Sequence, residues 1–162
     1  MPQLMPYRTQ QSLIMGVLCA PVGFGVGLYL WWGKTEPEFL DASFALNAPL
    51  AAFVTAFGLW QLLFRLQKSR NVFWGMCAGG AAGILSHWVC WYLEFFTANV
   101  CYWLTGGCVS SLGEPPANLI ESLFGATVMS IPSLLWFGPL TISLGILFGG
   151  ILAGVQRRSA VQ

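Results

Sequence analysis

Long apolar runs separated by short polar segments set the pattern of this sequence. Four of these runs are long enough to cross a hydrocarbon core of about 30 Å, which takes about 20 helical residues. We place the spans approximately at residues 13–32, 45–64, 72–94 and 134–155. Each run is continuously apolar and lacks the inside/outside alternation of a lumen-facing strand. The pattern therefore predicts a single all-α domain, an integral membrane bundle of four transmembrane helices.

A further segment, residues 117–131, has helical spacing but is too polar to span a membrane on its own. Its apolar residues fall on one side and its polar residues mostly on the other. Pro115 and Pro116 precede it, which suits the start of a helix. We expect either a short interfacial helix on the outer membrane surface or over the bundle, or an extension of the fourth span that is broken at Pro132.

The composition supports a membrane environment. Apolar residues make up 56% of the chain and charged residues only 8%, against about 25% charged in a typical globular protein. A water-soluble chain of 162 residues could not bury so much apolar surface. The sequence has no basic patch on a water-exposed domain, so we do not expect it to bind nucleic acid. The lipid bilayer is its first expected partner.

The charged residues are sorted between the connections. Basic residues precede the first span, fill the connection between the second and third, and follow the fourth, whereas the acidic residues lie in or beside the other two connections. Lys34 is the one exception. By the positive-inside rule, this predicts a multi-pass protein with cytoplasmic N- and C-termini. Because the loops are compact, we expect a bacterial inner (plasma) membrane. The basic residues in this pattern are Arg8, Arg65, Lys68, Arg70, Arg157 and Arg158.

Glycines recur at four-residue spacing in the third and fourth spans. Such residues stack on one face of a helix and let the backbone of another helix approach closely. These grooves either pack the bundle internally or bind another copy of the chain or another subunit, and the pattern leaves both options open. The glycines concerned are Gly75, Gly79, Gly83, Gly145, Gly149, Gly150 and Gly154.

Further along the glycine face of the third span lie His87, the chain's only histidine, and then Cys90 and Glu94. At this depth a neutral histidine can hydrogen-bond to a serine or a carbonyl of a neighbouring helix, whereas a charged one is costly. Beside this packing role, His87 and Glu94 could form a proton relay or an ion path, and His87 could ligate a haem or a pigment. A metal site of His87, Cys90 and Glu94 is the weakest option, because structural zinc needs four ligands at familiar spacing.

Cys101 and Cys108 lie in a connection that the charge pattern places outside the cytoplasm, with six residues between them. Gly106 and Gly107 let the chain turn back, and the compartment is oxidising, so we predict a disulfide. The alternative is a redox-active pair, which normally has C-x-x-C spacing because proximity lowers the thiolate pKa. The sequence contains no such motif.

The sequence contains no recognisable catalytic motif, so an enzyme is not the favoured interpretation. Many packing grooves coexist with few ionisable groups in the spans. We therefore expect a non-catalytic subunit or assembly factor of a larger membrane complex, or a homo-oligomer. The first alternative is an oligomeric transporter or channel with His87 and Glu94 on its pathway. The second is a membrane thiol-disulfide oxidoreductase. None of these functions requires a cofactor.

Overall fold

The computed structural model describes residues 4–32, 39–66, 71–109 and 112–159, which form four α-helices and no strand. All four helices are long and apolar enough to cross a membrane. Each predicted span lies within one of them, so the prediction of an all-α, multi-pass four-helix bundle is confirmed. The helices are α1 (Leu4–Trp32), α2 (Phe39–Leu66), α3 (Val72–Thr105) and α4 (Leu119–Ser159).

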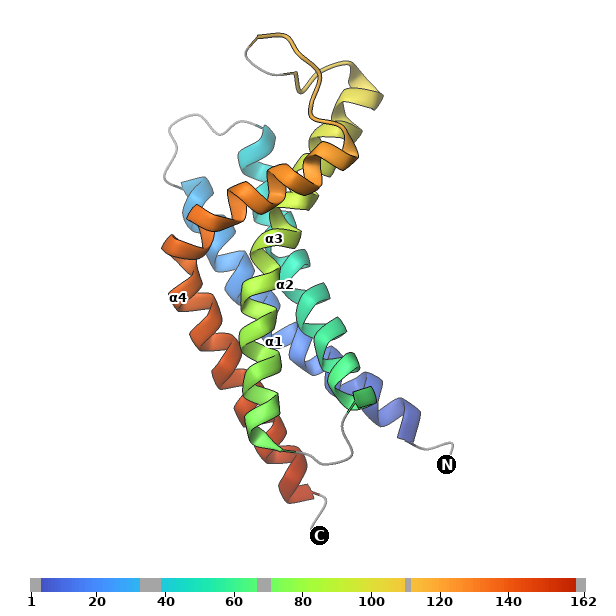
Figure 1. Cartoon of the computed structure of the whole chain (residues 1–162), viewed down its shortest axis with the longest axis vertical. Coiled ribbons are helices and arrows are strands. Elements are labelled where there is room, and N and C mark those ends of the chain that lie inside the picture. The colour runs from blue at the N-terminus through green and yellow to red at the C-terminus, as the bar shows by residue number, and fades with distance from the viewer. Residues whose placement is uncertain (1–3, 33–38, 67–70, 110–111, 160–162) are drawn as a thin grey trace.

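The helices run alternately up and down, so that the start of α1 and the end of α4 lie together (Figure 1). We call this the terminal end of the bundle, and the opposite end, where α3 finishes and α4 begins, the loop end. Four crossings return the chain to its starting end, as an even number of spans requires.

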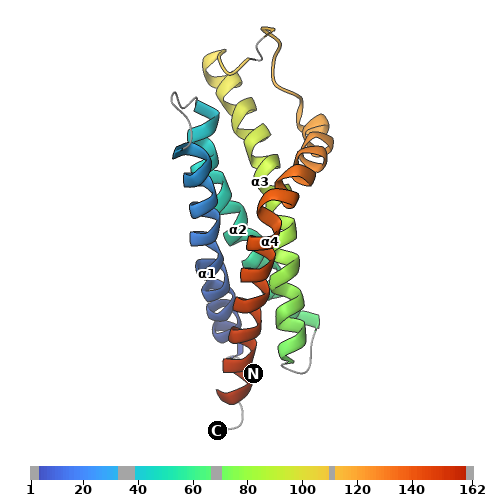
Figure 2. The ribbon, with the colours of Figure 1, turned by 90° about the vertical axis from the view of Figure 1, so that its left-hand side faces the viewer.

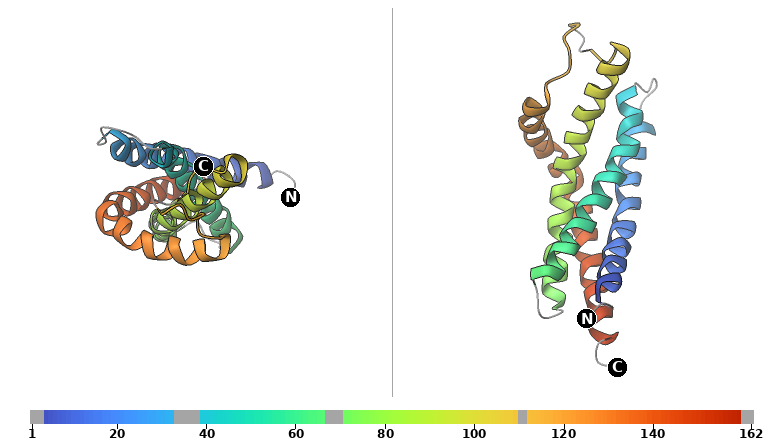
Figure 3. Two further views of the ribbon diagram at one scale, coloured as in Figure 1. Left: turned by 90° about the horizontal axis from the view of Figure 1, so that it is seen from above. Right: turned by 90° about the vertical axis from the view of Figure 1, so that its right-hand side faces the viewer.

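The helices associate as two pairs. α1 packs along α2 and α3 along α4, while the contact between α2 and α3 joins the pairs and α1 meets α4 over a short stretch only. In the loop half of the molecule, α4 leaves this arrangement and crosses α3 on the side away from α1 and α2 (Figures 2 and 3). The four helices therefore meet from the bend of α4 towards the terminal end, where one buried cluster contains residues of each helix.

The bend of α4 contains Pro132 and Pro139. Each proline lacks the backbone N–H that a helix needs and clashes with the carbonyl four residues earlier, which bends a helix. For residues 117–131 we expected either an interfacial helix or an extension of the fourth span. The segment is helical from Leu119 onward and continues through both prolines as the first part of α4, which agrees with the extension. The bend therefore replaces the break that we expected at Pro132.

The first part of α4 turns small residues towards α3. Ser122 and Ala126 are fully buried, while Ile120 is 80% and Phe124 is 74% exposed. Large apolar side chains on the outer surface suit contact with lipid rather than with water. A side-chain cap fixes the start of this helix, since Asn118 Oδ1 accepts hydrogen bonds from the backbone N–H groups of Ile120 (3.0 Å) and Glu121 (2.9 Å).

Glycines bring α3 and α4 into backbone contact in the terminal half of the bundle. A Cβ atom at Gly79 would overlap the carbonyl group of Gly145, and one at Gly75 would meet that of Gly149. Gly83 lies against the α4 backbone one turn further on. The groove on α3 is therefore filled by α4 of the same chain.

The second glycine pair of α4 behaves differently. Gly150 faces the side chain of Met76, whereas a Cβ at Gly154 would find nothing within 4 Å among the described residues.

Beside the glycine contact, Met15 and Trp60 fill the interior, with exposed fractions of 0% and 1%. The terminal half of the bundle is thus tightly packed.

α3 is longer than the predicted span. It contains 34 residues, which is about 50 Å of helix and more than the hydrocarbon core requires. It ends at Thr105, where Gly106 takes a left-handed conformation (φ 68°) and its N–H bonds to the Tyr102 carbonyl at 2.8 Å. Glu94, at the predicted end of the span, therefore lies about three turns inside the helix.

Candidate functional site

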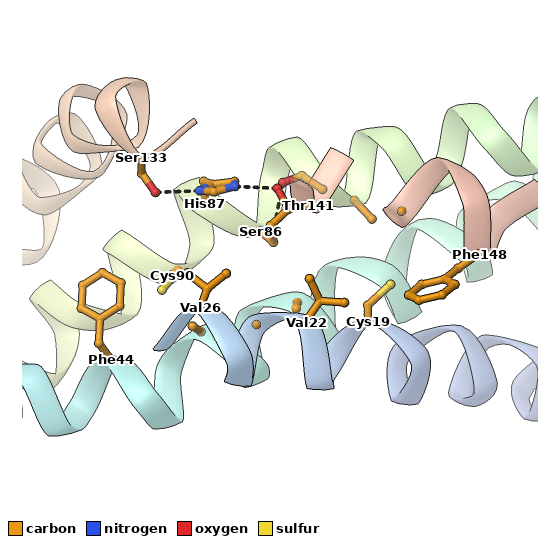
Figure 4. Close-up of a pocket in the computed structure, with 16 residues that line it drawn as sticks. Cys19, Val22, Val26, Phe44, Ser86, His87, Cys90, Ser133, Thr141 and Phe148 are labelled. Carbon is orange, nitrogen blue, oxygen red and sulfur yellow. Dashed lines mark hydrogen bonds between the residues drawn. The ribbon is translucent and has the colours of Figure 1, made fainter. Parts of the chain in front are cut away.

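His87 is buried between α3 and α4, with 7% of its surface exposed. Its Nδ1 atom lies 2.6 Å from Ser133 Oγ and its Nε2 atom lies 2.9 Å from Thr141 Oγ1 (Figure 4). These two hydroxyl groups stand on either side of Pro139 in the bent part of α4. The imidazole therefore forms hydrogen bonds to two parts of α4 that Pro139 separates.

The hydrogen-bond network fixes the form of the imidazole. The Thr141 hydroxyl donates to the Phe137 carbonyl (3.1 Å), so its oxygen accepts from Nε2–H of His87. The Ser133 hydroxyl then donates to the unprotonated Nδ1. The other tautomer would leave the Ser133 hydrogen without an acceptor among the described residues. On the basis of these bonds we assign the proton of the neutral imidazole to Nε2.

Glu94 is buried between α3 and α2, with 6% of its surface exposed. Ser43 Oγ donates to one carboxyl oxygen at 2.5 Å, and Asn47 Nδ2 donates to the other at 3.0 Å. Asn47 Nδ2 also lies 3.1 Å from Thr97 Oγ1. These bonds offset part of the cost of removing a carboxyl group from water. Although Glu94 ends the third predicted span, its side chain lies inside the helix interface.

A cavity of about 50 Å³ lies beside His87, where the four helices meet (Figure 4). Because a buried water occupies at least about 10–15 Å³ of such volume, the cavity has room for a few water molecules and not for an organic cofactor. Its polar lining consists of Ser86, His87, Ser133 and Thr141. Its other lining includes Cys19, Val22, Val26, Phe44, Cys90 and Phe148.

The residues present do not suit a haem or a metal ion. Both ring nitrogens of His87 are engaged by α4, which leaves no free nitrogen to act as an axial ligand. Glu94 is held towards α2, so the carboxyl group and the imidazole face different helices. Among the described residues, no three His, Cys, Asp or Glu side chains form a group able to hold a metal.

His87 lines the cavity, and Glu94 lies near it without lining it. They are two helical turns apart, about 10 Å along α3. Between them lies Cys90, which is 6% exposed and lines the cavity. Phe44 also lines the cavity, and its α2 neighbour Ser43 bonds to Glu94. The cavity thus reaches from the imidazole towards the carboxyl group, with Cys90 and Phe44 in between.

The Cys101–Cys108 pair lies away from this site. The two sulfur atoms are at bonding distance, 2.02 Å, as the sequence predicts for a disulfide. Cys101 is in the last turns of α3, about 20 Å along the helix from His87. The disulfide therefore closes the loop end of α3 and takes no part in the cavity.

Sequence reasoning did not name Ser43, Ser133 and Thr141 as site residues. A signal for them existed, because a buried neutral histidine needs one donor and one acceptor, and hydroxyl groups beside prolines on a neighbouring helix supply both. Nothing in the sequence showed which hydroxyl groups these are. Ser133 and Thr141 lie 46 and 54 residues from His87 in the sequence.

The chain was compared with protein-family models, with curated proteins and with solved structures, and none of the three comparisons gives a match. The geometry of the site is therefore the basis for the functional argument.

Proposed function

We propose that this chain is the protomer of a small proton-translocating transporter or channel, with His87 and Glu94 on its pathway. One observation carries the proposal: two titratable side chains of α3 are both buried, each is bonded to a different helix, and a cavity beside His87 extends to Cys90, one helical turn from Glu94. Ionisable residues inside a membrane are expensive and mark ion pathways and proton relays by default.

The proposed pathway begins at the loop end. Glu94 is the titratable group nearer to that end and accepts a proton there. Water in the cavity carries the proton to His87, whose Nδ1 accepts it in place of the Ser133 hydrogen. The charge pattern of the sequence supports placing the loop end outside the cell and both termini in the cytoplasm of a bacterium. Protons would therefore enter from the outside.

Passage beyond His87 requires a movement. In the described conformation, Met15 and Trp60 fill the interior on the terminal side of the cavity. The bend of α4 is the place where a movement costs least, because Pro132 and Pro139 have already removed two backbone hydrogen bonds. Protonation of His87 reverses the hydrogen bond to Ser133, because Nδ1–H then donates to Ser133 Oγ. The hydroxyl hydrogen of Ser133 must then find another acceptor, which changes the hydrogen bonding of this bend.

Two observations favour this proposal over a non-catalytic subunit. The subunit hypothesis relied on free packing grooves, and the α3 groove is filled by α4. It also relied on a core with few ionisable groups, and both His87 and Glu94 are buried there. An oxidoreductase is favoured less, because the Cys101–Cys108 pair is remote from the cavity and lacks C-x-x-C spacing.

The test is proton influx into liposomes that contain the purified protein and an enclosed pH-sensitive dye. A potassium diffusion potential, negative inside, drives the flux. Glu94→Gln keeps an oxygen and an amide in place of the carboxyl group but cannot take up a proton, so we expect influx at the level of empty liposomes. Ser130→Ala is the control, since Ser130 is a buried α4 hydroxyl whose bond in the described part of the chain goes to the Thr127 carbonyl of its own helix.

The same preparation separates the two remaining hypotheses. If the wild-type protein leaks no more than empty liposomes, the proposal is wrong. If it also co-purifies in mild detergent with a defined partner, and Glu94→Gln leaves that assembly functional, the chain is a subunit instead.

A further inference from the structure

The hydroxyl hydrogens around the cavity are all committed to acceptors of the protein itself. Ser86 donates to the Gly83 carbonyl at 2.9 Å, and Thr141 donates to the Phe137 carbonyl. Ser133 donates to His87 Nδ1. The remaining polar hydrogen, Nε2–H of His87, is taken by Thr141 Oγ1. The polar side of the cavity therefore offers oxygen lone pairs and no free strong donor.

The rest of the lining also favours a cation over an anion. No lining residue is a lysine or an arginine, and the thiols of Cys19 and Cys90 are weak donors only. The aromatic rings of Phe44 and Phe148 attract cations through their negative faces. An anion would find no compensating group here.

We infer that this cavity binds ammonium and its smallest substituted forms, that is, small cations that donate hydrogen bonds. The inference rests on the proposed function and specifies the substrate class of the same site. A hydronium ion presents the same donors, so protons and ammonium share one chemistry. A volume of about 50 Å³, with room for a few water molecules, admits ions of this size.

Potassium is the discriminating comparison, because it matches ammonium in charge and size but has no hydrogens. An ammonium ion needs only a few directed oxygen acceptors, which the three hydroxyl groups supply. A potassium ion needs a shell of oxygens that replaces its water on all sides. Most of this lining is apolar, so a bare metal cation would remain under-coordinated.

Thermal unfolding of the purified protein in detergent tests the inference. The protein is titrated with ammonium, methylammonium, potassium or formate at constant ionic strength and mildly acidic pH. A ligand that binds the folded state raises the unfolding temperature. We expect a rise with ammonium and methylammonium and none with potassium or formate. An equal rise with potassium overturns the donor requirement, and a rise with formate overturns the sign of the charge.

A matched pair of variants locates the effect. Ser86→Ala removes one lone pair from the cavity and should weaken the ammonium midpoint by about tenfold, the value of one hydrogen bond to a charged group. Ser130→Ala removes a hydroxyl with the same local bond, to the carbonyl three residues earlier, away from the cavity. It should leave the midpoint unchanged, and equal weakening by both variants contradicts the assignment of the site.

Flux measurements distinguish this inference from the proposed function. We expect uptake of labelled methylammonium. Ammonium should compete with this uptake, and potassium should not. A second outcome is proton flux in ammonium-free sodium buffer, with ammonium neither raising the unfolding temperature nor slowing that flux. This outcome overturns the ammonium site and leaves the proposed function standing. Absence of proton flux removes the proposed function, and the unfolding titration still decides whether the cavity binds ammonium.

Discussion

Ser43 of α2 donates a hydrogen bond to the buried carboxyl group of Glu94 on α3, across 2.5 Å. Both side chains are less than a tenth exposed, at 7% and 6%. Asn47, one turn further along α2, bonds to the other carboxyl oxygen. The carboxyl group is therefore held by two donors of one helix, and α2 fixes its place on the proposed pathway.

The first prediction concerns the stability that this arrangement provides. Glu94→Ala removes the carboxyl group that accepts from Ser43 and Asn47 and should lower the free energy of unfolding by about 1–3 kcal/mol. Glu94→Gln retains an acceptor oxygen and should cost less. Denaturant titration in detergent measures both. Equal stability of Glu94→Ala and the wild-type protein would contradict the buried network.

The second prediction concerns the glycine contact between α3 and α4. Gly79→Ala places a methyl group against the Gly145 backbone, so it should lower stability by about 1–3 kcal/mol or more. Gly58→Ala is the control, because a Cβ there meets nothing within 4 Å of described residues and alanine is the better helix former. If Gly79→Ala is as stable as Gly58→Ala, the groove is open, and another subunit becomes its expected occupant.

The third prediction concerns the two hydroxyl groups that bond His87. Ser133→Ala removes the donor to Nδ1, and Thr141→Val removes the acceptor of Nε2–H. Each should change the imidazole ¹⁵N resonances, and each should reduce proton influx in liposomes. Because the chain has one histidine, its side-chain signal is unambiguous. Wild-type ¹⁵N shifts in both variants would show that His87 is bonded elsewhere.

The fourth prediction concerns the disulfide. Cys108→Ser should lower stability by about 2 kcal/mol, because the closed loop is short. It should leave proton influx unchanged, since the bond lies about 20 Å along α3 from His87. A large loss of flux on reduction would instead place the Cys101–Cys108 pair in the activity and revive the oxidoreductase hypothesis.

The sequence predicts the fold better than it predicts the site, for physical reasons. Four apolar runs require four helices in lipid, because backbone groups there must bond within the segment. The length of α3 was missed because helix ends outside the hydrocarbon are set by caps such as Gly106 rather than by hydropathy. The sequence left open whether residues 117–131 extend the fourth span, and the expected break at Pro132 is a bend because a membrane helix tolerates a proline.

The site was predicted in part. The sequence indicates that His87 and Glu94 share one side of α3, because their spacing is helical. It does not show that His87 bonds to α4 while Glu94 bonds to α2. That division depends on how α4 bends over α3 and on the rotation of each helix about its axis. Local sequence does not determine either of these quantities.

The most direct measurement of the central claim is the initial rate of proton influx under an inside-negative potential, compared between Glu94→Gln and Ser130→Ala. Influx at the wild-type rate in Ser130→Ala and at the rate of empty liposomes in Glu94→Gln is the predicted result. Equal rates in the two variants would contradict a proton pathway through Glu94.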